Sequence, residues 1–180
     1  MRIQTVTYLF VLAVCTLSSL YAQEEPLVEK GVLDLREYDF LNNGPVEVRG
    51  EYEFYWNQMI SPALEGDSGE MIYTEVPGSW TKLRKEYPEV TRFGFATYRL
   101  LILLPEKVDE LAFSVEDVYS ASGYFLNGKA IDYLGFPGVN KYQTVIRYSR
   151  PLMIGTVNDQ ELELFILLSK FETRINNSSS

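Results

Sequence analysis

The sequence predicts an all-β fold, a sandwich or jelly roll, and three observations favour it. Several short runs alternate apolar and polar residues, which is the period of a half-buried strand. Turn residues separate these runs at short intervals. No segment has a long amphipathic helical period, so the helices that alternate with strands in a parallel sheet are not expected.

The expected strands follow one another along the chain at 46–56, 71–76, 96–104, 111–115, 123–126, 129–133, 145–148 and 162–168. Within the first, Gly50 marks a bend or bulge. Residues 57–64 are expected to form a short turn of helix before an exposed loop. The run 96–104 is the clearest strand, because it is almost wholly apolar and is typical of a central strand covered on both faces. Asn127-Gly128 predicts a tight type I′ hairpin turn.

The first 22 residues have the pattern of an export signal. Arg2 supplies the positive start, residues 6–20 are largely apolar, and Ala22 offers a small residue for cleavage. The apolar run is shorter than the roughly 20 residues that cross a bilayer. We therefore expect a signal peptide at 1–22, a linker at 23–30, one β-sandwich domain at 31–172, and a polar tail or truncated continuation at 173–180.

Cys15 leaves a second interpretation of the N-terminus open. The run Leu12-Ala13-Val14-Cys15 is similar to a lipoprotein lipobox, although Val14 departs from the small residue expected there. An acylated Cys15 would anchor the domain, whereas cleavage after Ala22 leaves a chain without cysteine and without disulfides. Either route predicts a periplasmic location or the outer face of the cytoplasmic membrane.

Composition excludes several functions. The chain contains no histidine, which removes Ser-His-Asp and Cys-His catalysis and the commonest metal ligand. Its net charge of −9 disfavours nucleic acid as a partner, because phosphate binding needs a basic face. No phosphate-binding loop, dinucleotide motif or calcium loop is present. We expect no catalytic residues, no metal and no cofactor, and we interpret the many carboxylates as solvated surface acids rather than as a glycosidase pair.

The candidate ligand-binding residues lie mostly in expected loops, where binding residues concentrate. Trp80 follows Pro77-Gly78 and could equally line a rim or be buried. A single charge interrupts the central strand, and it must be paired or face a polar cavity. Aromatic faces and polar side chains together favour a small polar or carbohydrate ligand. The candidates are Trp80, Arg99, Tyr119, Ser120, Asn140 and Tyr142.

An ordered series of motifs resembles a known family. The series is Val76-Pro77-Gly78-Ser79-Trp80, Gly94-Phe95-Ala96-Thr97-Tyr98-Arg99-Leu100, Leu104-Pro105, Tyr119-Ser120-Ala121 and Leu126-Asn127-Gly128-Lys129. It resembles the jelly-roll, galactose-binding-like sensor domain of bacterial seven-transmembrane receptors with diverse intracellular signalling modules. It is also similar, mainly in fold, to the sugar-binding domain of β-galactosidase and β-glucuronidase-type hydrolases.

The receptor resemblance implies an exported, non-catalytic domain that binds a carbohydrate-like small molecule and signals through membrane domains of a full-length receptor, truncated here. Two alternatives stay open: a carbohydrate-binding accessory domain of a glycoside hydrolase, and a β-sandwich that binds a protein partner. Resemblance in fold to a hydrolase domain transfers no catalysis by itself.

Overall fold

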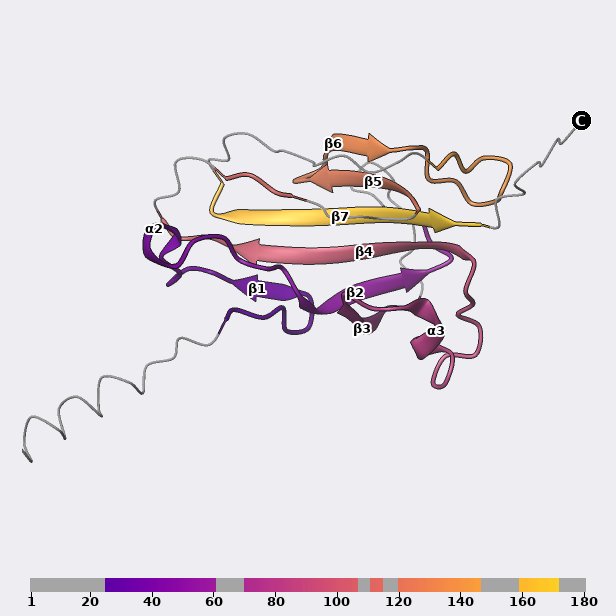
Figure 1. Cartoon of the computed structure of the whole chain (residues 1–180), viewed down its shortest axis with the longest axis horizontal. Helices are drawn as coiled ribbons and strands as arrows, with labels where there is room; N and C mark the ends of the chain where they lie inside the picture. Colours follow the sequence, from indigo (N-terminus) through magenta and orange to yellow (C-terminus); the bar gives the residue numbers. More distant parts are fainter. Residues whose placement is uncertain (1–24, 61–69, 107–110, 115–119, 147–158, 172–180) are drawn as a thin grey trace, which may run out of the picture.

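The computed structural model describes residues 25–60, 70–106, 111–114, 120–146 and 159–171. Within these residues the chain forms a seven-stranded sheet and two four-residue helices (Figure 1). The elements are β1 Val32–Asp34, α2 Phe40–Asn43, β2 Gly50–Trp56, β3 Ile72–Val76, α3 Trp80–Leu83, β4 Gly94–Leu103, β5 Ala121–Leu126, β6 Lys129–Leu134 and β7 Glu161–Lys170. The predicted all-β class is confirmed.

The strand order in the sheet is β3-β2-β4-β7-β5-β6. All of these neighbours pair antiparallel, whereas β1 pairs parallel with the second half of β4, from Val32 opposite Leu101 to Asp34 opposite Leu103. Figure 1 shows β4 and β7 as the two long strands through the middle of the sheet. Strand β4 is therefore central, as its continuous apolar run predicts.

Paired strand residues share a face of the sheet, and the register defines one row of side chains on each face. Phe54, Tyr98, Ile166 and Tyr124 are successive partners across β2, β4, β7 and β5, and they lie on the main core face. Loop residues cover one part of this face, including Tyr38, Phe40, Val46, Val48, Leu111 and Phe113. On the opposite face the corresponding row is Glu53, Arg99, Phe165 and Phe125.

The hairpin between β5 and β6 is confirmed in detail. Asn127 and Gly128 both have positive φ, 44° and 79°, which a type I′ turn requires. The Asn127 amide also donates to Asp159 at 2.8 Å, and its oxygen accepts from the Glu163 backbone N–H at 2.7 Å. This side chain therefore joins the hairpin to the start of β7.

Several local expectations differ from the structure. Residues 111–114 keep the alternating burial of a strand but pair with none, so the predicted strand is wrong over these residues. Residues 57–60 are not helical, because the Thr97 hydroxyl of β4 holds their backbone: it donates to the Gln58 carbonyl at 2.7 Å and accepts from the Ile60 N–H at 2.9 Å. Residues 61–64 lie outside the described part of the chain.

The strand predicted from residue 46 begins at Gly50, where φ is 125° and the backbone of Val28 packs against the glycine. A Cβ at Gly50 would lie 2.3 Å from the Val28 carbonyl oxygen, so only glycine fits this approach. Val28 is itself 2% exposed and belongs to the core, although the sequence suggested a linker there. Of the strand expected at 145–148, Val145 forms one bridge with Phe136, and residues 147–148 lie outside the described part.

Candidate ligand-binding site

The loop at residues 135–146 is the part of the described chain where exposed aromatic and polar side chains gather. It follows β6 and is closed by reciprocal backbone hydrogen bonds: Phe136 N–H to the Val145 carbonyl at 2.8 Å and Val145 N–H to the Phe136 carbonyl at 3.0 Å. The buried Ser169 hydroxyl on β7 donates to the Gly138 carbonyl at 2.6 Å. The loop is therefore fixed both at its base and to the sheet.

Asn140 shapes the tip of this loop. Its side-chain oxygen accepts from the backbone N–H groups of Tyr142, at 3.0 Å, and Gln143, at 3.1 Å, and its carbonyl accepts from the Thr144 hydroxyl at 2.9 Å. Asparagine side chains commonly organise turns in this way. Gly138 allows the close packing, since a Cβ there would lie 2.6 Å from the Gln143 Cβ. Asn140 thus sets the backbone that presents Tyr142.

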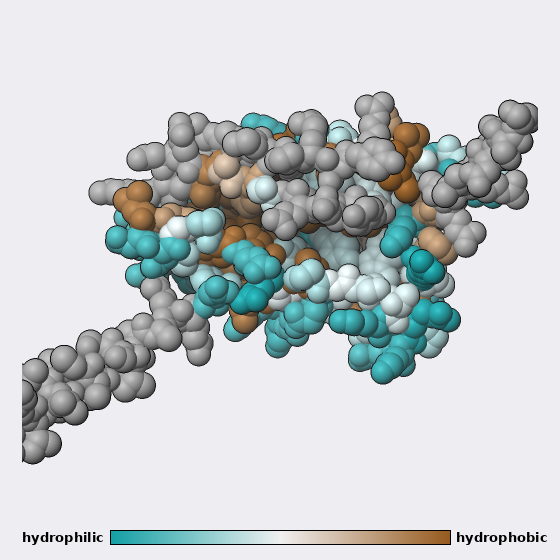
Figure 2. Space-filling model, viewed as in Figure 1, coloured by the Kyte–Doolittle hydropathy of each residue, from teal (hydrophilic) through white to brown (hydrophobic). Residues whose placement is uncertain are grey.

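The fixed loop still holds its large side chains in solvent. Tyr142 is 85% exposed and Phe136 58%, and Figure 2 shows hydrophobic surface at the end of the molecule where Figure 1 draws this loop. The Lys141 ammonium lies 5.0 Å from the centroid of the Tyr142 ring. An exposed ring on a rigid backbone is suited to stacking, because little conformational entropy is lost when a ligand covers it.

Trp80 lies on the opposite face of the same sheet end, and it is buried. Its indole N–H donates to the Tyr98 hydroxyl at 2.7 Å, and its ring packs edge-on against Trp56 at a centroid distance of 5.0 Å. Burial raises the pKa of Tyr98 to about 12, and the hydrogen bond from Trp80 opposes that shift. The sequence allowed Trp80 to line a rim or to be buried, and the structure shows that it is buried, at 8% exposure.

Arg99 is paired with two carboxylates, so the first of the two expectations for this charge is met. Its guanidinium donates to Glu53 at 2.8 Å and to Glu163 at 2.8 Å, across β2, β4 and β7. Burial lowers the pKa of the guanidinium, but its hydrogen bonds to the two carboxylates and their negative charges outweigh it and raise that pKa above its usual value. Arg99 therefore links three strands.

Of the two remaining candidates, the structure describes only Ser120, which does not join the loop surface. Ser120 is 6% exposed at the start of β5, and Tyr119 lies outside the described residues. The structure thus brings Asn140 and Tyr142 together and leaves Trp80, Arg99 and Ser120 inside or across the sheet. Phe136 and Lys141 complete the loop surface, and the signal for them was available, since both stand in the short segment between Leu134 and Tyr142.

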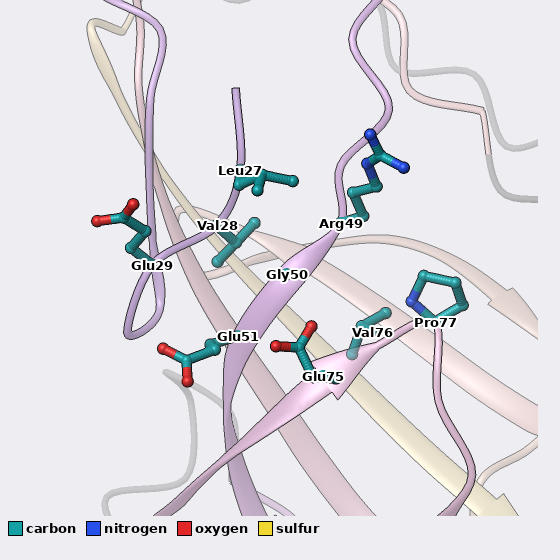
Figure 3. Close-up of a pocket in the computed structure, with 9 residues that line it drawn as sticks. All are labelled: Leu27, Val28, Glu29, Arg49, Gly50, Glu51, Glu75, Val76 and Pro77. Carbon is teal, nitrogen blue, oxygen red and sulfur yellow. The ribbon is translucent and has the colours of Figure 1, made fainter. Parts of the chain in front are cut away.

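A concave region lies at the start of β2, around Gly50. It is a shallow depression of about 560 Å³ between the N-terminal segment, β2 and β3 (Figure 3). Its charged lining residues are Glu29, Arg49, Glu51 and Glu75, and Glu51 stands directly opposite Glu75 in the strand register. It has no aromatic lining residue and includes none of the predicted site residues. It is therefore a poorer candidate for stacking a sugar than the loop.

No metal centre or membrane helix accompanies these surfaces in the described chain. No three carboxylate, thiol or imidazole side chains gather there as a metal-binding group. None of its helices has the length and apolar character needed to cross a bilayer.

Comparison with solved structures identifies the fold. A Faecalibacterium prausnitzii β-glucuronidase matches 69% of this chain with a TM-score of 0.52 and 12% identity. A Ruminococcus gnavus β-glucuronidase and a GH2 β-galacturonidase from Eisenbergiella tayi match 68% and 71% of it, with TM-scores of 0.48 and 0.43 and identities of 13% and 14%. The chain spans 20% of the length of each. No family model and no curated protein matches the chain.

The first match defines the class of protein: a β-sandwich domain with the fold of one portion of a glycoside hydrolase. It agrees with the predicted sandwich and with the resemblance to β-glucuronidase-type hydrolases. The resemblance to a seven-transmembrane receptor sensor has no counterpart among these matches. Low identity limits the likeness to the fold, so residues and activity cannot be carried across.

Proposed function

We propose that this chain is a non-catalytic, carbohydrate-binding accessory domain of the kind that accompanies glycoside hydrolases, and that the 135–146 loop holds the saccharide. The observation that carries the proposal is Tyr142, whose ring is 85% exposed on a loop closed by hydrogen bonds. The fold supports it, since the chain matches a portion, 20%, of a β-glucuronidase.

The chemistry of the loop suits a sugar better than an apolar ligand. The flat ring of Tyr142 can cover the C–H face of a pyranose, and Lys141 and Gln143 on either side offer exposed polar groups for hydroxyls. The non-catalytic role is supported by the pairing of the sheet carboxylates Glu53 and Glu163 with Arg99, which occupies them in ion pairs across the strands. Export and lipid attachment remain predictions, because residues 1–24 are outside the described chain.

The receptor-sensor function remains the second interpretation of the sequence, and no described feature favours it over the accessory domain. Both interpretations share a small polar ligand at a loop. A protein partner on the same exposed side chains is the third, and an experiment with saccharides separates it from the other two.

The test is binding of the purified protein to an array of neutral and acidic oligosaccharides, followed by titration calorimetry of any saccharide retained. We expect binding to at least one saccharide and a loss of affinity of about tenfold in Tyr142→Ala, roughly 1.4 kcal/mol. The matched control is Tyr73→Ala, because Tyr73 is 39% exposed on edge strand β3. A folded protein that binds no saccharide, or a Tyr142→Ala variant with unchanged affinity, contradicts the proposal.

A further inference from the structure

The charge distribution of the loop departs from that of the whole chain. The protein is acidic, with 25 Asp and Glu residues against 16 Lys and Arg. From Tyr133 to Ile146, however, the sequence contains no carboxylate, and Lys141 is the one charged residue. A ligand on this loop therefore meets a local positive charge on a protein whose net charge is negative.

Lys141 lies close enough to Tyr142 to contact a ligand that stacks on the Tyr142 ring. Its ammonium lies over the Tyr142 ring, 5.0 Å from the centroid, and both side chains are exposed. A sugar that stacks on this face displaces the ammonium from the ring and leaves it beside the bound sugar. Among the described residues no carboxylate forms an ion pair with Lys141, whereas Arg36, Arg49 and Arg99 all have acidic partners. The ammonium can therefore form a charge-assisted hydrogen bond with an incoming anion.

We propose, resting on the function proposed above, that the loop selects saccharides bearing a carboxylate, with Tyr142 stacking on a uronic acid ring and Lys141 pairing with its carboxylate. The depression near Gly50 provides the opposite environment, because three glutamates, Glu29, Glu51 and Glu75, line it together with one arginine. At about 0.15 M salt, charges further than roughly 8 Å are largely screened. Carboxylates further than this from the loop therefore contribute little to the potential at Lys141.

The experiment compares α-1,4-linked trigalacturonate with its methyl ester, which keeps the rings and removes the charge. Titration calorimetry at about 0.15 M salt should give the acid about two- to fivefold tighter binding than the ester, the range of an exposed ion pair. In Lys141→Gln the preference should disappear while ester binding is retained. In Lys129→Gln, an exposed lysine on β6 and outside the loop, the preference should be unchanged.

The outcomes separate this inference from the proposed function. If acid and ester bind the wild type equally, or if Lys141→Gln keeps the preference, the selection of carboxylates is wrong and carbohydrate binding stands. If neither trigalacturonate form binds while a neutral saccharide on the array does, the selection is again wrong. If the folded protein binds no saccharide at all, both proposals fail together.

Discussion

Two groups of aromatic side chains occupy the same end of the sheet and are held in opposite ways. Trp80 packs with Phe54 and Trp56 on the core face, beside Leu168 of β7. Phe136 and Tyr142 project from a loop that is tied to Ser169, the next residue of β7. Side chains of neighbouring strand residues point to opposite faces, so the two groups lie on either side of one sheet.

The residues that follow Trp80 and Tyr142 explain why one side chain is buried and the other is exposed. Both Trp80 and Tyr142 follow a Pro-Gly pair within five residues, so their immediate context is alike. After Trp80, however, Leu83, Tyr87 and Val90 recur and join the same cluster, whereas Lys141 and Gln143 flank Tyr142. Trp80 is buried because its successors supply the rest of a core cluster, whereas the apolar residues that follow Tyr142, Val145 and Ile146, are themselves exposed.

The largest expected effect is the loss of stability in Trp80→Ala. Removing the indole leaves a cavity beside Phe54 and Trp56 and an unpaired Tyr98 hydroxyl, which should lower the free energy of unfolding by about 3–5 kcal/mol. Urea denaturation followed by tryptophan fluorescence and circular dichroism measures it. A loss below about 1 kcal/mol would mean that Trp80 is not part of the core.

The second effect is an alkaline loss of stability through Tyr98. Its folded pKa of about 12 exceeds the ordinary value of 10, so the unfolded chain loses this proton first. Its stabilising contribution is complete below pH 10 and falls as pH rises towards 12, by up to about 2 kcal/mol. Tyr98→Phe should be less stable at pH 7, because the Trp80 N–H loses its acceptor, and should decline less steeply above pH 10. Equal slopes in urea titrations across this range contradict the burial of Tyr98.

A smaller effect is expected when the loop is detached from the sheet. Ser169→Ala removes the 2.6 Å hydrogen bond to the Gly138 carbonyl and leaves that carbonyl with only the longer 3.3 Å hydrogen bond from the Thr144 hydroxyl, at a cost of about 1 kcal/mol. The loop should also exchange its amide protons faster, which hydrogen exchange measures, and saccharide affinity should fall. Unchanged exchange in residues 136–145 would show that the backbone closure alone fixes the loop.

Much of the sheet was predictable because strand alternation and turn chemistry are local signals. The apolar run of β4 and the Asn127-Gly128 hairpin both match the structure. The missing strand at 111–114 was not predictable, since its alternating burial arises from packing on the core without a pairing strand. An alternating pattern predicts which side chains are buried, but it does not predict whether the backbone forms hydrogen bonds with a neighbouring strand.

The candidate site was predictable in part. Asn140 and Tyr142 were identified from a loop rich in turn residues, and they do lie together. Trp80 and Arg99 were predicted to bind a ligand, but the structure gives both of them structural partners instead. These partners, Tyr98 for Trp80 and Glu53 and Glu163 for Arg99, lie 18 to 64 residues away in the sequence. Such long-range contacts have no local signature.

The most direct test of the central claim is a map of amide chemical-shift changes in the ¹⁵N-labelled protein as the saccharide selected on the array is added. The account predicts that the largest changes cluster in residues 135–146, and that residues lining the depression around Gly50 and Glu75 change little. Changes concentrated at that depression, or at the Trp80 cluster, would contradict it.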